Sequence, residues 1–227
     1  MNYFSFNGIS NKSAGVVLLE PIGKLSPKQR GEFITVPGRD GQLFADEGAA
    51  DVIEITLPIW VRPDADADYV RRWLRGAGRL KTEEGATGSY DAIVSDGYKM
   101  TALPMNSGFT ANVPMTLQPY ATQDAESKYT LSSSGLVTNP APIDCYARVV
   151  LHGSGSGQVN IGGRVFSFDS FKDGTEVDGV NREAYYGTTI CSGQMDGEWP
   201  YLAPGSNAVS FSGGVRSVEI FVQWPVL

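Results

Sequence analysis

The clearest hydrophobic pattern in the chain is a strict alternation in its second quarter. Every second position is apolar, through Ile53, Ile55, Leu57, Ile59 and Val61. A period of two puts alternate side chains on opposite faces of a β-strand, so this stretch predicts a strand with one apolar face. Pro58 lies inside it and cannot donate a ladder hydrogen bond, which predicts a sheet edge or a bulge there.

The segment before this strand is long for a connection. Residues 32–36 read E-F-I-T-V and predict its partner strand, while residues 37–52 hold three glycines and little apolar content. A hairpin needs only a few loop residues, and Pro37-Gly38 and Asp40-Gly41 predict a series of turns. Long connections in compact domains are often functional. We therefore predict an arm that grips another subunit, carried by Val36, Pro37, Gly38, Arg39, Asp40, Gly41, Gln42, Leu43 and Phe44.

One stretch has the marks of a helix. Pro63-Asp64 is a start signal and Gly76 is placed for a C-terminal cap, so the sequence predicts a helix over residues 64–75. Aspartates lie near the positive end of its dipole and arginines near the negative end. Trp73 and Leu74 belong to an apolar stripe, which predicts that the helix lies on a sheet.

The rest of the chain reads as strands and turns. Residues 109–117 alternate and predict a core strand, and residues 121–135 are polar and serine-rich, which is typical of a linker. Beyond them, short apolar runs at turn spacing predict a β-sandwich, with G-S-G-S-G at residues 153–157 as a turn. The predicted fold is mainly β. Its parts are a first domain (residues 1–122), a linker (residues 123–135) and a second domain (residues 136–227).

Composition narrows the class of protein. The formal net charge is −7, which disfavours binding to nucleic-acid phosphates. No apolar run approaches the roughly 20 residues of a membrane-spanning helix. The first residues lack a basic region followed by a long apolar core, so we expect no secretory signal and folding in a cytoplasm.

Candidate chemistry is sparse. Asp64, Asp66 and Asp68 imitate the start of a calcium loop, but Tyr69 and Arg75 occupy the positions where that loop needs glycine and glutamate, so helix capping is the better interpretation.

A catalytic thiol site is equally disfavoured. His152 is the only histidine, which excludes a pair of histidine ligands. Cys145 and Cys191 are expected to be free, buried thiols, and the strand register puts Cys145 and His152 on opposite faces. We predict no catalytic, cofactor-binding or metal-binding residue.

Aromatic residues near the end of the chain leave two interpretations open. Trp199 and Tyr201, with Tyr185 and Tyr186, could form a platform for a sugar ring, or they could belong to the core or to an interface.

Several motifs, taken as a set, are similar to those of a known family. The chain resembles the distal tail proteins, also called phage tail family proteins, of long-tailed phages and prophages of Gram-positive bacteria. The resemblance covers nearly the whole chain. Its motifs at the front are F-N-G-I-S-N-K-S-A-G-V-V-L (residues 6–18), V-P-G-R-D-G (36–41), I-T-L-P-I (55–59), W-L-R-G-A-G-R-L (73–80) and L-Q-P-Y (117–120). At the back they are E-W-P-Y-L-A-P-G-S-N-A-V-S-F-S-G-G-V-R-S-V-E-I (198–220) and Q-W-P-V-L (223–227).

The resemblance implies a structural protein, not an enzyme, without a cofactor. It implies a first domain like that of tail-tube proteins, a β-sandwich with one helix and an extended hairpin arm, closed into a homohexameric ring. The second domain would be a sandwich like a galectin or a carbohydrate-binding module. The ring would join the tail tube to the tail-tip hub or lysin protein, with receptor-binding proteins as further partners in some phages.

Two functions are therefore compared. The first is a baseplate or tail-tip hub of the virion, made and assembled in the host cytoplasm, with DNA passing through a neutral or negative lumen. The alternative is a carbohydrate-binding module that recognises the host surface.

Overall fold

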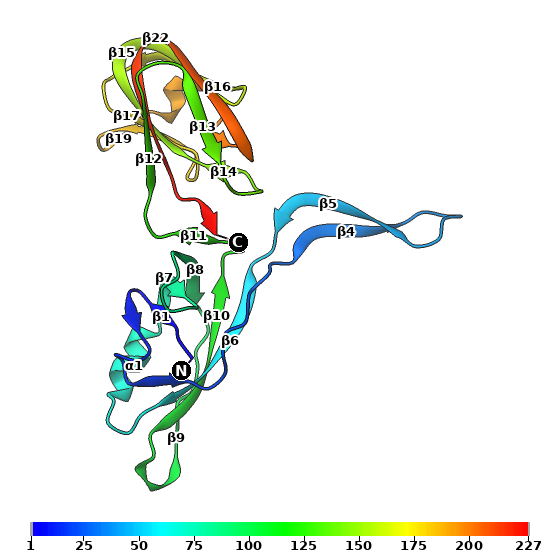
Figure 1. The fold of residues 1–227 in the computed structure, drawn as a ribbon, viewed down its shortest axis with the longest axis vertical. Helices are drawn as coiled ribbons and strands as arrows, with labels where there is room; N and C mark the ends of the chain where they lie inside the picture. The colour runs from blue at the N-terminus through cyan, green and yellow to red at the C-terminus, as the bar shows by residue number, and fades with distance from the viewer. Residues whose placement is uncertain (1, 227) are drawn as a thin grey trace. The chain divides into compact units, whose positions relative to one another are not determined.

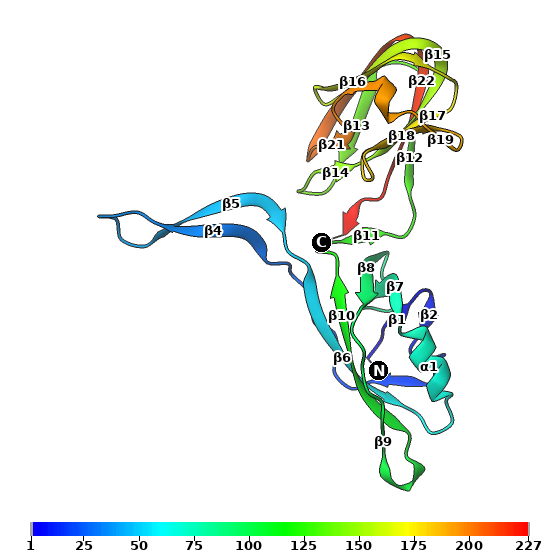
Figure 2. The same cartoon turned by 180° about the vertical axis from the view of Figure 1, so that it is seen from behind.

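The structure is a computed structural model that describes residues 2–226. It consists of two compact units, Met1–Ala121 and Thr122–Leu227. Regular structure is almost all β, and the single α-helix of the described residues, α1 (Ala67–Trp73), belongs to the first unit (Figures 1 and 2). The predicted mainly β fold is confirmed. Among the described residues, no helix has the length and apolar character needed to span a membrane.

The first unit is built on one antiparallel sheet with the strand order β2-β1-β7-β8-β10-β6-β3, and β9 pairs with β10. The bounds are β1 (Ser5–Phe6), β2 (Ile9–Ser10), β3 (Val16–Leu18), β6 (Ile53–Val61), β7 (Gly76–Lys81), β8 (Gly88–Val94), β9 (Thr101–Ala102), the 3-10 turn η1 (Pro104–Asn106) and β10 (Phe109–Leu117). The strands β6 and β10 pair along their whole lengths. The alternation of β6 puts Leu57, Ile59 and Val61 in the core, as predicted.

Pro58 lies at the point where the ladder between β3 and β6 ends. That ladder runs only from Val16↔Val61 to Leu18↔Ile59. The Leu19 N–H then donates to the Pro58 carbonyl at 2.9 Å. Since the N–H and C=O of a strand residue point to the same side, the missing donor of Pro58 faces this ladder end and costs no bond to β10. The predicted edge is confirmed here.

The helix α1 is shorter than the predicted residues 64–75. The helix begins directly after Asp66, which caps its N-terminus because the Asp66 carboxylate accepts the Tyr69 N–H at 3.0 Å. At the other end, the Trp73 indole N–H donates to the Phe6 carbonyl at 2.8 Å. That bond ties the helix to β1, so the apolar stripe packs on the sheet as predicted.

The second unit is a β-sandwich built around two long strands, β15 (Arg148–Ile161) and β22 (Gly205–Val222). The other elements are β12 (Ser127–Leu131), β13 (Gly135–Asn139), β14 (Cys145–Tyr146), β16 (Arg164–Phe171), β17 (Thr175–Asp178), β18 (Glu183–Tyr186), β19 (Thr189–Ile190), η2 (Ser192–Gln194), β20 (Met195–Gly197), β21 (Tyr201–Leu202) and β23 (Pro225–Val226). The short strand β11 (Ala121–Gln123) lies at the boundary of the two units.

The long strands bend together at their middles. The first half of β15 pairs with β17 and its second half with β16, while β22 stays its partner on both sides of the bend. A Cβ on Gly153 would collide with the Gly214 carbonyl oxygen, and one on Gly214 with the Ser154 carbonyl oxygen. The G-S-G-S-G motif is therefore not the predicted turn. It is a bend inside a strand, where only glycine allows two backbones to approach so closely.

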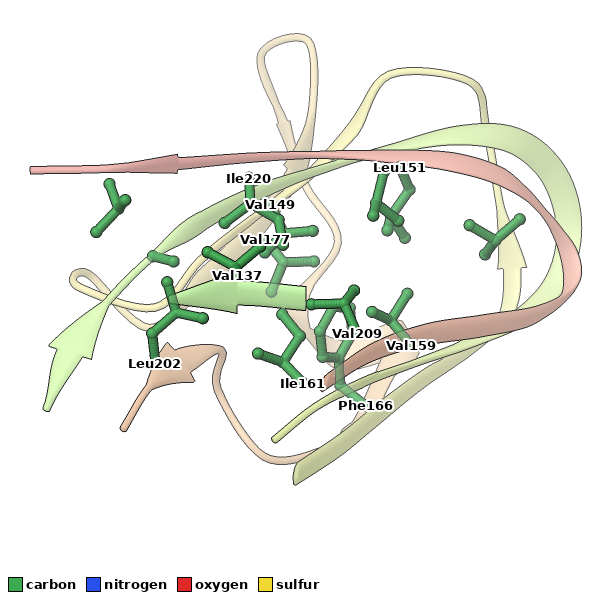
Figure 3. Close-up of a cluster of buried hydrophobic side chains, with 14 of the residues drawn as sticks. Val137, Val149, Leu151, Val159, Ile161, Phe166, Val177, Leu202, Val209 and Ile220 are labelled. Carbon is green, nitrogen blue, oxygen red and sulfur yellow. The ribbon is translucent and has the colours of Figure 1, made fainter. Parts of the chain in front are cut away.

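The bend brings the two halves of each strand to opposite sides of one core. Val149, Leu151 and Ile220 come from one side, and Ile161 and Val209 from the other (Figure 3). All five side chains are almost fully buried, so the folded-over strand pair forms the sandwich.

The stretch of residues 123–135, which the sequence assigned to a linker, contains a strand. Within it, β12 pairs with β22 from Ser127↔Val222 to Leu131↔Val218. Half-buried and exposed side chains alternate along β12, because only one of its faces meets the core.

Candidate functional site

The arm is a two-stranded ribbon made of β4 (Gln29–Thr35) and β5 (Gln42–Ala50). The two strands pair with each other and form a sheet of their own, which extends away from the sheet of the first unit (Figure 1). This corrects two predictions. Residues 32–36 do not pair with β6, whose partners are β10 and β3. Residues 37–52 are not a series of turns, since most of them form β5.

The predicted arm residues fall at the outer end of this ribbon. Residues 36–41 form the reversal, in which Gly38 and Gly41 have φ of 79° and 78°. Glycine adopts such left-handed angles without strain. The Gln42 amide donates to the Thr35 hydroxyl at 3.0 Å, which joins the two strands next to the turn. Gln42, Leu43 and Phe44 begin β5.

Both faces of the ribbon carry an exposed apolar pair. Residues directly opposite in an antiparallel ladder share a face, and neighbours along a strand alternate between faces. Phe33 lies opposite Phe44, with ring centroids 5.0 Å apart, and Ile34 lies opposite Leu43. Phe33 is 66% exposed, Ile34 45%, and Leu43 and Phe44 41% each. The two pairs occupy opposite faces, so neither face is covered within the chain.

Polar contacts hold the base of the ribbon. The Asp51 N–H donates to the Lys28 carbonyl at 2.8 Å, and the Arg30 guanidinium pairs with the Asp51 carboxylate at 3.0 Å. The Asp46 carboxylate accepts the Gln29 amide at 2.9 Å and the Gly48 N–H at 2.8 Å. These two hydrogen bonds lower the pKa of Asp46. The contacts that hold the base of the ribbon in place are therefore polar.

The ribbon has little support of its own. An isolated two-stranded hairpin is marginally stable in water, and a ribbon of this kind leaves both of its backbone edges unpaired. The exposed apolar pairs on both faces make the isolated ribbon still less favourable in water. The arm is suited to adding strands or apolar contacts to another protein surface.

The two aromatic residues considered for a sugar platform, Trp199 and Tyr201, pack against different neighbours. Trp199 is half-buried and packs against the core of the second unit. On β21, Tyr201 is covered by the Arg164 guanidinium, 3.6 Å from its ring centroid, and contacts Tyr146 at a centroid distance of 5.7 Å.

The remaining candidate residues, Cys145 and His152, have surroundings typical of structural side chains. Cys145 is buried, and burial raises the pKa of its thiol to about 11, so it is a poor nucleophile. His152 lies between two acids, with Nδ1 3.4 Å from Asp173 and Nε2 3.7 Å from Glu219. Over residues 2–226, no group of three or more His, Cys, Asp or Glu side chains is arranged to hold a metal ion.

No protein-family model matches the chain, and no curated protein matches it. Among solved structures, the chain is similar to the SPP1 Dit (gp 19.1) protein, described as a paradigm of the hub adsorption apparatus in Gram-positive infecting phages. The TM-score is 0.77, the sequence identity is 13%, and the match covers 100% of both chains. The two proteins thus share a fold over their whole lengths.

Proposed function

We propose that this chain is a distal tail protein, a structural hub at the tail tip of a phage or prophage that infects Gram-positive bacteria. The observation that carries the proposal is the arm, a projecting ribbon with an uncovered apolar pair on each face. Support comes from the full-length fold likeness to a protein of a phage hub adsorption apparatus and from the motifs of the sequence.

The proposed assembly is a ring of six copies in which each arm contacts the next copy. A head-to-tail contact uses two different surfaces of each copy, and such contacts form a closed ring when their rotation closes. The ribbon supplies one of the two surfaces. Covering both of its apolar pairs would remove from water the side chains that the single chain leaves exposed. The first unit forms the ring, and the second unit is displayed by it.

The proposed place of the ring is between the tail tube and the tail-tip hub or lysin protein, with receptor-binding proteins as further partners. The protein is made and assembled in the host cytoplasm and ends in the virion tail tip. Its formal net charge of −7 suits a channel that DNA passes without binding. A ring with a strongly basic lumen would contradict this part of the proposal.

The proposal is tested by making each arm face polar in turn. One variant combines Phe33→Ser with Phe44→Ser, and the other Ile34→Ser with Leu43→Ser. Each buried large apolar side chain contributes about 1.5–3 kcal/mol. Removing two per contact should therefore raise the dissociation constant of the assembly at least ~100-fold. Sedimentation velocity of the full chain, alone and with co-produced tail proteins, measures the loss.

The control combines Leu136→Ser with Val180→Ser, two side chains of the second unit that are 68% and 69% exposed. It should assemble like the unchanged protein. If both arm variants also do so, the arm is not the contact that closes the ring. If the control loses assembly as well, making any exposed apolar pair polar prevents assembly, and the arm is not the specific contact.

A further inference from the structure

The arm contains a β-bulge near its base. In the ladder of the ribbon, Gln29 lies opposite Ala50 and Gly31 lies opposite Asp46. Two steps along β4 therefore match four steps along β5, so β5 carries two more residues than its partner strand over this stretch. Extra residues on one strand bend a ribbon and increase its twist. In Figure 1, β5 arches near its end, where the ribbon approaches β6.

A single carboxylate oxygen holds this bulge together. Oδ1 of Asp46 accepts the Gly48 N–H at 2.8 Å and the Gln29 side-chain amide at 2.9 Å. The first hydrogen bond closes a turn within β5, and the second joins β5 to β4. Gly48 has φ of 69° and open space around its Cβ position, so glycine takes this left-handed conformation without strain. Asp46 thus connects the turn of one strand to the backbone course of the other.

The outer side of the bulge is linked to one of the apolar pairs. A Cβ on Gly31 would collide with the Ala45 carbonyl oxygen and with the Phe44 ring. The Phe44 ring therefore lies against the backbone of β4 at Gly31, and it also contacts the Phe33 ring at a centroid distance of 5.0 Å. The position of this exposed aromatic pair consequently depends on the strand geometry directly beside Asp46.

We propose that the bulge presets the direction of the arm in the free chain, with Asp46 as its positioning residue. A ribbon of two strands has no core of its own to define its direction, so the bulge and its hydrogen bonds define it. A ribbon that is already fixed loses less conformational entropy on docking than a flexible one. The preset bend is a property of the single chain, and only its use in assembly rests on the proposed function.

The experiment measures the direction of the arm by double electron–electron resonance between two spin labels. Arg39→Cys carries one label at the turn, and Thr56→Cys carries the other at an exposed position of β6. Cys191→Ser removes a half-buried thiol that would also take the label. Labelled chains are diluted in an excess of unlabelled chains, so that distances within one chain are read. We expect a narrow distance distribution, which Asp46→Ala should broaden. Sedimentation of the same variant without labels should show the dissociation constant of the assembly raised about 3- to 10-fold.

Two controls isolate the hydrogen bonds of Asp46. Asp46→Asn keeps an oxygen at the accepting position, and Glu47→Ala removes the exposed carboxylate next to it in the chain. Both should keep the distribution narrow. A broad distribution in the unchanged chain, a narrow one in Asp46→Ala, or equal broadening by either control would overturn the proposal. A narrow distribution in a chain that never assembles, broadened by Asp46→Ala alone, would support the preset bend and contradict the ring.

Discussion

Replacing residues 29–50 with two glycines should abolish assembly and leave the first unit folded. The Lys28 carbonyl and the Asp51 N–H are already hydrogen-bonded at 2.8 Å, so a two-residue loop can join the ends of the cut. No residue of the arm belongs to the core cluster of the first unit. We therefore expect the melting temperature to change by only a few degrees. The sedimenting species should be a monomer at every concentration.

Two outcomes would contradict this prediction. Unfolding of the first unit would mean that the ribbon supports its core. Closed assemblies of the shortened chain would mean that another surface joins the copies. Arg39→Ala in the full-length arm is the control, since it changes the exposed turn and keeps both apolar pairs.

The largest expected effect on stability is at the bend of the second unit. Gly214→Ala would force a Cβ against the Ser154 carbonyl oxygen, a backbone atom that no side-chain rotation can move. We expect a loss of at least about 3 kcal/mol in the free energy of unfolding, at the upper end of overpacking effects. The melting temperature of the second unit should fall by roughly 10 °C or more. Scanning calorimetry measures both quantities.

Two further glycines separate crowding from backbone strain. Gly155 has φ of 93° and open space around its Cβ position, so Gly155→Ala should cost only about 1–3 kcal/mol of strain. Gly193 has open space and no left-handed angle, so Gly193→Ala should be nearly neutral. Equal effects at Gly214 and Gly193 would show that close approach of the bent strands does not limit stability.

The regular strands could be predicted because one of their faces is buried. In β6 and β10 the core requires an apolar residue at every second position, and that requirement is visible in the sequence. The helix was overextended at its start because Asp64 and Asp66 are both acceptable caps. Only the observed hydrogen bond from the Tyr69 N–H to Asp66 decides between them.

The two strands of the arm could not be predicted in this way, because both faces of the ribbon carry apolar side chains. No alternation of polar and apolar residues marks β4 and β5. Residues 32–36 were therefore predicted to pair with β6, the nearest strand with a clear pattern. A signal was nevertheless present. Ile34 and Leu43, and likewise Phe33 and Phe44, lie at equal distances on either side of the turn, which is the symmetry of a hairpin.

Features that depend on distant contacts could not be predicted. The glycines of G-S-G-S-G indicate a change of direction, but the partner that makes it a bend, Gly214, lies far along the chain. The prediction of Trp199 and Tyr201 as a sugar platform rests on residue type alone, and no local pattern indicates that the Arg164 guanidinium packs on Tyr201.

The most direct test of the account is the mass of the unchanged chain in solution, read together with electron micrographs, alone and with its tail partners. We predict closed rings of six 24.4 kDa copies, with each arm lying on the next copy. A monomer at every concentration and with every tail partner, with the ribbon folded back on its own chain, would contradict it.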